Sequence, residues 1–269
     1  MQQDSVIIDF LPENIGRYRT GYAVVAIDVI RATTTLATGK ALGRRCYVAP
    51  DIEHALSRAS SMERPLLAGE KGGDMPAGFD MTNSPAALAL RVDIERPMIL
   101  VSSSGTRLID GARSCEAAYL ACFRNWRAIA AQVCGRHPRV AVIGAGTRGE
   151  FREEDQICCA WVARYLIEHG YAAGDARTLD IVARWGGAPP AACLVSRSVA
   201  YLKRSNQLED LEFILSHVDD LDIVLTLSGD EIVTAGGCEV TLIRSGAAAP
   251  ARRRSALQRY GRRAATLPR

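Results

Sequence analysis

Short apolar runs alternate with longer amphipathic segments along most of this chain. The short runs are rich in Val, Ile, Leu and Ala, and several are apolar at every position, which is typical of strands buried on both faces. The predicted strands are residues 6–10, 22–29, 46–49, 65–69, 97–103, 115–121 and 139–144. The segments between them have helical spacing and are residues 31–43, 51–62, 84–92, 124–133 and 153–170.

This alternation predicts an α/β fold, a three-layer α/β/α arrangement with a mostly parallel sheet. After residue 185 the pattern is mainly helical and ends in two strand-like segments, DIVLTL and EIVTAG. No repeat and no clear linker interrupts it. We therefore predict a single domain over residues 1–243, followed by a basic, flexible tail over residues 244–269.

The net charge of +3 comes from that tail, which contains eight arginines and no acidic residue; subtracting 8 from +3 leaves the rest of the chain at −5. The tail has few large apolar residues, so we expect it to be solvated rather than to bind nucleic acid. No apolar run reaches the roughly 18 residues of a membrane helix, and the N-terminus lacks the pattern of a secretory signal. Eight cysteines without a CxxC pair fit buried free thiols. We expect a cytosolic protein.

Polar residues gather where four of the predicted strands end. Ligands of open α/β sheets bind beyond the carboxyl ends of the strands, so these residues predict one shared site. Glycines there let backbone N–H groups approach phosphate oxygens, and carboxylates at several strand ends suit Mg²⁺. The residues, strand by strand, are Asp28, Arg31, Thr33, Thr34 and Thr35; Glu70, Lys71, Asp80 and Asn83; Ser104, Gly105 and Thr106; Gly146, Thr147, Glu153, Glu154 and Asp155.

Each of these residues also has a simpler explanation. Asp28 could cap a helix, Glu70 could belong to a surface turn, and the threonine hydroxyls could satisfy the first turn of a helix. Glu153 and Glu154 could complement a helix dipole. Their common position at one edge of the sheet favours a functional site.

The stretch GAGTRG, residues 144–149, is a literal G-x-G-x-x-G. In a dinucleotide-binding fold the third glycine lies within the helix, whereas here an acidic segment follows and apolar helical spacing begins only near Ile157. A nucleotide-cofactor enzyme is therefore the less favoured alternative. GEKGGD lacks the G-K-[ST] of a P-loop, and CCAWVAR lies inside a predicted helix, where it cannot wrap a phosphate. Metal-assisted attack by water is the simpler chemistry.

Six segments resemble the 2-phosphosulfolactate phosphatases in order and spacing: DVIRATTT (28–35), GEKGG (69–73), GFDMTNSP (78–85), SSGT (103–106), GTRGEFREED (146–155) and LEDLEFILSHVDDLDIV (208–224). The resemblance covers about residues 5–225. It implies a Mg²⁺-dependent acid phosphatase with its own α/β fold, often dimeric, that hydrolyses 2-phospho-3-sulfolactate to 3-sulfolactate and phosphate, a step toward coenzyme M. Thr82, Ser104 and Leu225 stand where the family usually has Gly, Asn and Pro, which leaves a related phosphorylated acid open as the substrate.

With that chemistry, Asp28, Glu70 and Asp155 are the predicted Mg²⁺ ligands, direct or through water, with Asp80 or Glu154 in reserve. Asp28, Arg31, Glu70 and Asp155 form the predicted catalytic set. We expect Arg31 and Lys71 to neutralise phosphate or sulfonate. The remaining oxygens would be held by Thr33, Thr34, Asn83, Ser104, Gly105, Thr106, Gly146 and Thr147. A non-catalytic anion-binding or regulatory module is the alternative from another class.

Overall fold

The computed structural model describes residues 3–146 and 149–235, so the predicted tail lies outside the described residues. Ten strands form one sheet in the order β4-β5-β3-β10-β9-β6-β2-β7-β1-β8. The strands are β1 (Ser5–Asp9), β2 (Ala23–Ile27), β3 (Cys46–Val48), β4 (Leu66–Gly69), β5 (Met98–Val101), β6 (Ala117–Ala121), β7 (Arg139–Gly144), β8 (Ala172–Ala173), β9 (Leu225–Ser228) and β10 (Glu231–Thr234).

Helices connect these strands and also follow them. They are α1 (Ala32–Ala41), α2 (Ile52–Ala59), α3 (Pro85–Ala89), α4 (Gly105–Ala112), α5 (Trp126–Val133), α6 (Glu153–Glu168), α7 (Ala176–Trp185), α8 (Arg197–Arg204) and α9 (Leu208–Ser216). Two 3-10 helices, η1 (Pro12–Tyr18) and η2 (Pro190–Val195), complete the described secondary structure.

The sheet consists of two parallel groups joined by an antiparallel hairpin. Strands β4, β5 and β3 pair in parallel, and so do β6, β2, β7, β1 and β8. The hairpin of β9 and β10 lies between the groups and pairs antiparallel with β6 on one side and β3 on the other. The predicted mostly parallel α/β sheet is therefore confirmed, with the last two strands of the described chain at its centre.

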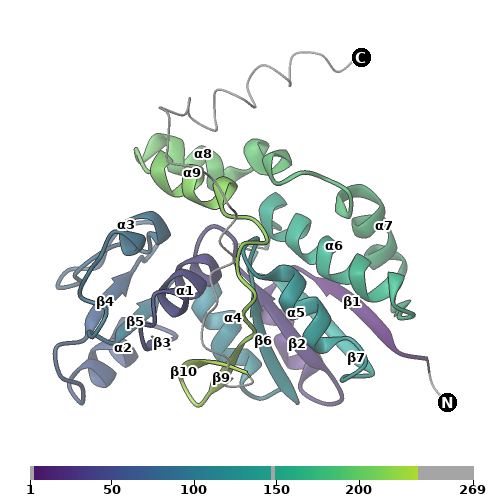
Figure 1. The fold of residues 1–269 in the computed structure, drawn as a ribbon, viewed down its shortest axis with the longest axis horizontal. Coiled ribbons are helices and arrows are strands. Elements are labelled where there is room, and N and C mark those ends of the chain that lie inside the picture. Colours follow the sequence, from purple (N-terminus) through teal and green to yellow (C-terminus); the bar gives the residue numbers. More distant parts are fainter. Residues whose placement is uncertain (1–2, 147–148, 236–269) are drawn as a thin grey trace.

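Helices cover both faces of the sheet (Figure 1). On strand β2, Val25 and Ile27 pack into the core that α5, α6 and α7 share, whereas Val24 and Ala26 pack into the core beneath α1 and α4. Every residue of β2 is buried, as a strand between two helical layers requires. Helices α8 and α9, light green at the top of Figure 1, pack against each other, and α9 also packs against α3.

Local sequence signals explain several boundaries. Asp51 and Ser84 are the N-caps of α2 and α3, and they accept hydrogen bonds from the backbone N–H groups of His54 (2.9 Å) and Ala87 (3.0 Å). The helix α4 was not expected from the sequence. The segment after Gly170 contains the short strand β8 and the helix α7. All seven cysteines within the described residues are free thiols. Among those residues no helix combines the length and the apolar character needed to cross a membrane.

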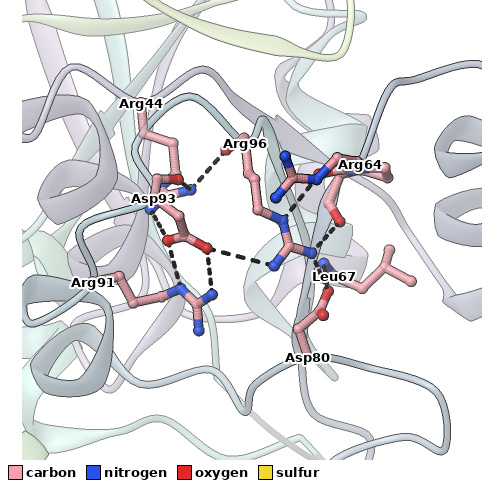
Figure 2. A network of polar contacts seen from close by, with 8 residues as sticks. Arg44, Arg64, Leu67, Asp80, Arg91, Asp93 and Arg96 are labelled. Atoms are coloured by element: carbon pink, nitrogen blue, oxygen red, sulfur yellow. Dashed lines mark hydrogen bonds and ion pairs between the residues drawn. The ribbon is translucent and has the colours of Figure 1, made fainter.

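An arginine–aspartate network fixes the loop between α3 and β5 (Figure 2). The Arg44 side chain is fully buried and donates to the backbone oxygens of Asp93 and Arg96, both at 2.7 Å, and to the Asp93 carboxylate at 3.0 Å. Arg91 and Arg96 also contact the Asp93 carboxylate. These guanidinium groups hold the pKa of the Asp93 carboxyl well below its ordinary value, with the Arg91 hydrogen bond as the largest cause.

Asp93→Ala should destabilise the protein by about 2–4 kcal/mol, because it leaves the buried Arg44 charge without its carboxylate partner. Asp110→Ala, which removes a surface ion pair with Arg113, is the matched control and should cost no more than about 1 kcal/mol. Urea unfolding at neutral pH measures both changes. Equal losses in the two variants would show that the network contributes no more than a surface pair.

Candidate active site

A cavity of about 620 Å³ opens at the carboxyl edge of the sheet, between the strand ends and α8. Loops that follow β1, β2, β4, β5 and β7 contribute residues to its wall. Among the predicted site residues, the cavity is lined by Asp28, Arg31, Glu70, Asn83, Ser104, Gly146 and Asp155. Segments far apart in sequence thus meet at the edge where the prediction placed them.

Asp28 and Asp155 form the acidic floor of this cavity. Both carboxylates are buried, and Asp155 Oδ1 accepts a hydrogen bond of 2.8 Å from the backbone N–H of Val29, which ties the first turn of α6 to the end of β2. Burial, together with repulsion from Glu70 and Glu154, raises the pKa of Asp28 to about 7, although a backbone hydrogen bond from Ala32 opposes the rise. Two close acidic groups at such a floor favour either a shared proton or a bound cation.

Gly105 lies against the same floor at a position that leaves no room for a side chain. A Cβ at this position would lie 2.0 Å from Asp28 Oδ2 and 2.7 Å from the Cβ of Ala32. No other residue fits without moving the carboxylate. The N-termini of α1 and α4 therefore meet at Asp28, where the dipoles of both helices add positive potential.

Glu154 is a buried carboxylate next to Asp155 that does not itself line the cavity. It is 1% exposed, and neither of its side-chain oxygens has a partner of regular geometry among the described residues. Burial raises its pKa, although the nearby Ser198 and Ser196 hydroxyls partly oppose the rise. Its charge also raises the pKa values of Asp28 and Asp155, after the larger effect of burial on each. An orphaned carboxylate beside two others indicates that this floor is completed by a group that neutralises negative charge.

Glu70 organises the two loops that face Asp28. Its Oε1 accepts from the backbone N–H of Ser103 (2.6 Å), and its Oε2 accepts from the backbone N–H of Gly73 (2.7 Å) and the hydroxyl of Ser103 (2.9 Å). Because both oxygens already accept hydrogen bonds, Glu70 is better placed to reach a hydrated cation through water than to ligate it directly.

Arg31 is held by α9. Its Nη1 forms a buried ion pair of 2.7 Å with Asp210 and also contacts Gln207. The other oxygen of Asp210 accepts from the Ser84 hydroxyl (2.6 Å) and the backbone N–H of Ala86 (3.1 Å). One carboxylate therefore fixes both the Arg31 guanidinium and the start of α3.

Asp210→Ala should lower kcat/KM by roughly a hundredfold, because a misplaced guanidinium no longer meets the substrate in the productive position. Asp210→Asn keeps acceptors for Ser84 and Ala86 and should lose less. Glu209→Ala, at an exposed position of the same helix, is the control. Steady-state kinetics beside a thermal melt separate loss of activity from loss of fold. Wild-type kinetics in a folded Asp210→Ala protein would contradict the role of this pair.

The predicted threonines support the loops and do not line the cavity. Thr33 Oγ1 donates to the backbone oxygen of Asp28 (2.7 Å) and accepts from its N–H (3.0 Å), and Thr34 Oγ1 donates to the backbone oxygen of Val29 (2.8 Å). Thr106 bonds in the same way with the backbone of Ser102. These hydroxyls bond the backbone of the loops before α1 and α4, and not the N–H groups of the first helical turns as the simpler explanation supposed.

Other predicted residues lie apart from the cavity. Lys71 is exposed and does not line it. Asp80 accepts hydrogen bonds from the backbone N–H of Leu67 (2.8 Å) and from Arg96 (3.0 Å) in the network of Figure 2, outside the cavity wall. Asn83 lines the cavity, and its Oδ1 accepts from Thr35. Thr147 lies outside the described residues.

Sequence reasoning missed four arginines that line the cavity. Arg107, Arg152, Arg197 and Arg204 line the cavity from α4, from the residue before α6 and from α8. Helix α8 is fixed there by a hydrogen bond of 2.6 Å from the Tyr201 hydroxyl to the backbone oxygen of Gly73. Arg107 and Arg152 lie just beyond strand ends and could have been found by that rule, but no pattern in α8 indicates that it crosses the sheet edge.

The carboxylates of the cavity floor can contribute to a Mg²⁺ site but do not form a complete one by themselves. The orphaned Glu154 oxygens and the mutual repulsion of the floor carboxylates fit a divalent cation. Within residues 3–146 and 149–235, however, no three His, Cys, Asp or Glu side chains are grouped closely enough to hold a metal by themselves. Mg²⁺ commonly keeps waters and takes one or two carboxylates together with substrate phosphate oxygens, and the floor suits that mode.

Fold and cavity together define an α/β protein with a cavity at the carboxyl edge of its sheet that is lined by buried carboxylates and by arginines. The family model described as 2-phosphosulpholactate phosphatase matches residues 9–230. The chain therefore belongs to the 2-phosphosulfolactate phosphatase family, which places it among the phosphoric monoester hydrolases.

Individual relatives agree with this placement. The chain is 36% identical to a probable 2-phosphosulfolactate phosphatase of Pseudothermotoga lettingae over 157 residues, which is 58% of this chain and 66%, just under two thirds, of that protein. It is 32% identical to one of Synechococcus sp. (strain CC9605) over 70% of this chain and 80% of the relative. It is 29% identical to one of Synechococcus sp. (strain WH7803) over 84% of this chain and 94% of the relative.

Proposed function

We propose that this protein is a Mg²⁺-dependent phosphatase that hydrolyses 2-phospho-3-sulfolactate, or a closely related small phosphorylated acid, to 3-sulfolactate and phosphate, as in coenzyme M biosynthesis. The observation that carries the proposal is the convergence of Asp28, Glu70 and Asp155, from the ends of β2 and β4 and the first turn of α6, on one cavity that is also lined by arginines. The names of the relatives supply the substrate.

Asp28 and Asp155 would hold the cation, with Glu70 reaching it through water. Mg²⁺ supplies neutralisation of the phosphate charge and makes a water molecule more acidic. Arg31, fixed by Asp210, orients a phosphate oxygen, and the dipoles of α1 and α4 add positive potential near Asp28. Phosphoryl transfer depends mainly on positioning and charge neutralisation, which are what these residues provide.

A colorimetric assay of released phosphate tests this function. Purified protein is incubated with 2-phospho-3-sulfolactate, 2-phospholactate and phosphoglycolate, with Mg²⁺ or with EDTA. We expect turnover with Mg²⁺, fastest on phosphosulfolactate, and its loss in EDTA. Binding of the acids without phosphate release would favour a non-catalytic anion-binding module, and binding of NAD(P) would favour a nucleotide-cofactor enzyme. A cytosolic location and assembly as a homodimer also remain predictions.

A further inference from the structure

Some of the arginines that line the cavity are paired with a carboxylate, and others are not. The Arg31 charge is matched by the buried Asp210 carboxylate. Arg152 and Arg197 both form ion pairs with Glu150. Arg107 and Arg204 also line the cavity, yet neither guanidinium makes a hydrogen bond or an ion pair with any residue that the structure describes. These two guanidinium groups are therefore the arginines of the cavity wall that have no carboxylate partner among the described residues.

The position of Arg204 is fixed by the way α8 is anchored. Tyr201 packs on Gly73 so closely that a Cβ on that glycine would lie 2.7 Å from Tyr201 Cζ, and its hydroxyl donates to the Gly73 oxygen. Gly73 is itself held by Glu70. Residues three apart on a helix share a face, so Arg204 lies on the side of α8 that carries Tyr201 and faces the cavity.

The acidic floor and the unpaired arginines of the cavity suit two different anionic groups of one substrate. A phosphate belongs at the acidic floor, because a cation and the N-termini of α1 and α4 can neutralise it there. A second acidic group on the same small molecule has no such partner at the floor, where Asp28, Asp155 and Glu154 repel it. Arginine, with its planar fork of donors, is the residue best matched to the oxygens of a sulfonate.

We infer that Arg107 and Arg204 form a subsite for the second strong anion of the substrate, the sulfonate of 2-phospho-3-sulfolactate. This inference rests on the proposed function and adds the residues that select a substrate carrying a sulfonate beside its phosphate and carboxylate over 2-phospholactate, which carries only the latter two. Both residues are exposed, so their replacement removes charge from the cavity wall without opening the core.

The test is the ratio of kcat/KM for 2-phospho-3-sulfolactate to that for 2-phospholactate, which lacks the sulfonate. The ratio is measured for the wild type, Arg107→Ala, Arg204→Ala and the double variant. Lys203→Ala, an exposed cation next to Arg204 that does not line the cavity, is the control. We expect each single change to lower the ratio by about tenfold, mainly through KM, and the double change to lower it further, whereas the control keeps the wild-type ratio.

An unchanged ratio in the double variant, whether both activities fall together or neither falls, would overturn the inference and leave the proposed function standing. A wild type that hydrolyses no phosphorylated acid would instead overturn the proposed function. Calorimetry then decides the inference separately, by comparing the binding of 3-sulfolactate with that of lactate in the wild type and the double variant. Equal binding of the two probes by the wild type would reject the subsite.

Discussion

Asp28→Asn should lower the kcat of phosphate release by about a hundredfold or more. The change keeps the size of the side chain but removes one of the two most central charges of the acidic floor, a loss comparable with that of a major electrostatic stabiliser. The lost charge would also weaken Mg²⁺ binding, so the Mg²⁺ concentration for half-maximal activity should rise. Steady-state assays across a Mg²⁺ titration measure both effects.

Asp222→Asn is the matched control, because Asp222 is exposed and outside the cavity, and it should behave as wild type. The thermal melt of Asp28→Asn should not fall below that of the wild type, since the change relieves repulsion in a buried cluster. Near wild-type turnover of Asp28→Asn with unaltered Mg²⁺ dependence would remove Asp28 from the proposed site.

The metal-free protein should lose stability as the pH rises from about 5 to 8. Burial raises the pKa of Asp28 from its ordinary 3.8 to about 7, so between these values the folded state holds a proton that the unfolded state has released. Stability is therefore present at low pH and is lost as the pH rises through the folded-state pKa. We expect a loss on the order of 2 kcal/mol, or about 5 °C in Tm for a chain of this length.

Mg²⁺ should reverse this loss, because it favours the ionised floor. Its stabilising effect in a thermal melt should be larger at pH 8 than at pH 5. Asp28→Asn removes the titrating carboxyl and should show a flatter pH dependence without metal, which isolates the effect from other groups such as His54. A metal-free wild type with the same pH dependence as Asp28→Asn would mean that Asp28 does not titrate in this range.

Part of the site could be predicted from the positions at which the apolar strands end. Asp28, Glu70 and Asp155 each come shortly after an apolar strand, and parallel strands bring such ends to one edge, so their meeting in one cavity could be expected from the chain. The same rule also predicted residues that do not line the cavity, such as Lys71 and Asp80. It did not distinguish Asp28 from Asp80, because it says nothing of which way a loop turns after its strand.

The sequence did not predict helix α4. The segment from Gly105 to Ala112 is short and contains two glycines, so its spacing is a weak helical signal. It is helical because its apolar side packs on β2 and β6 and its first residue fits against Asp28. Tertiary packing therefore outweighed local propensity in this segment.

The sequence by itself determined the α/β class, most strands and helices, and the edge at which acidic residues gather, because these depend on periodicity and on the order of elements along the chain. Only the tertiary structure decided that β9 and β10 join two parallel groups, that α9 fixes Arg31 through Asp210, and that α8 brings Arg197 and Arg204 to the cavity. Those contacts join residues more than a hundred positions apart, and they form because one arrangement buries the apolar faces of all the elements together. No local pattern encodes that choice.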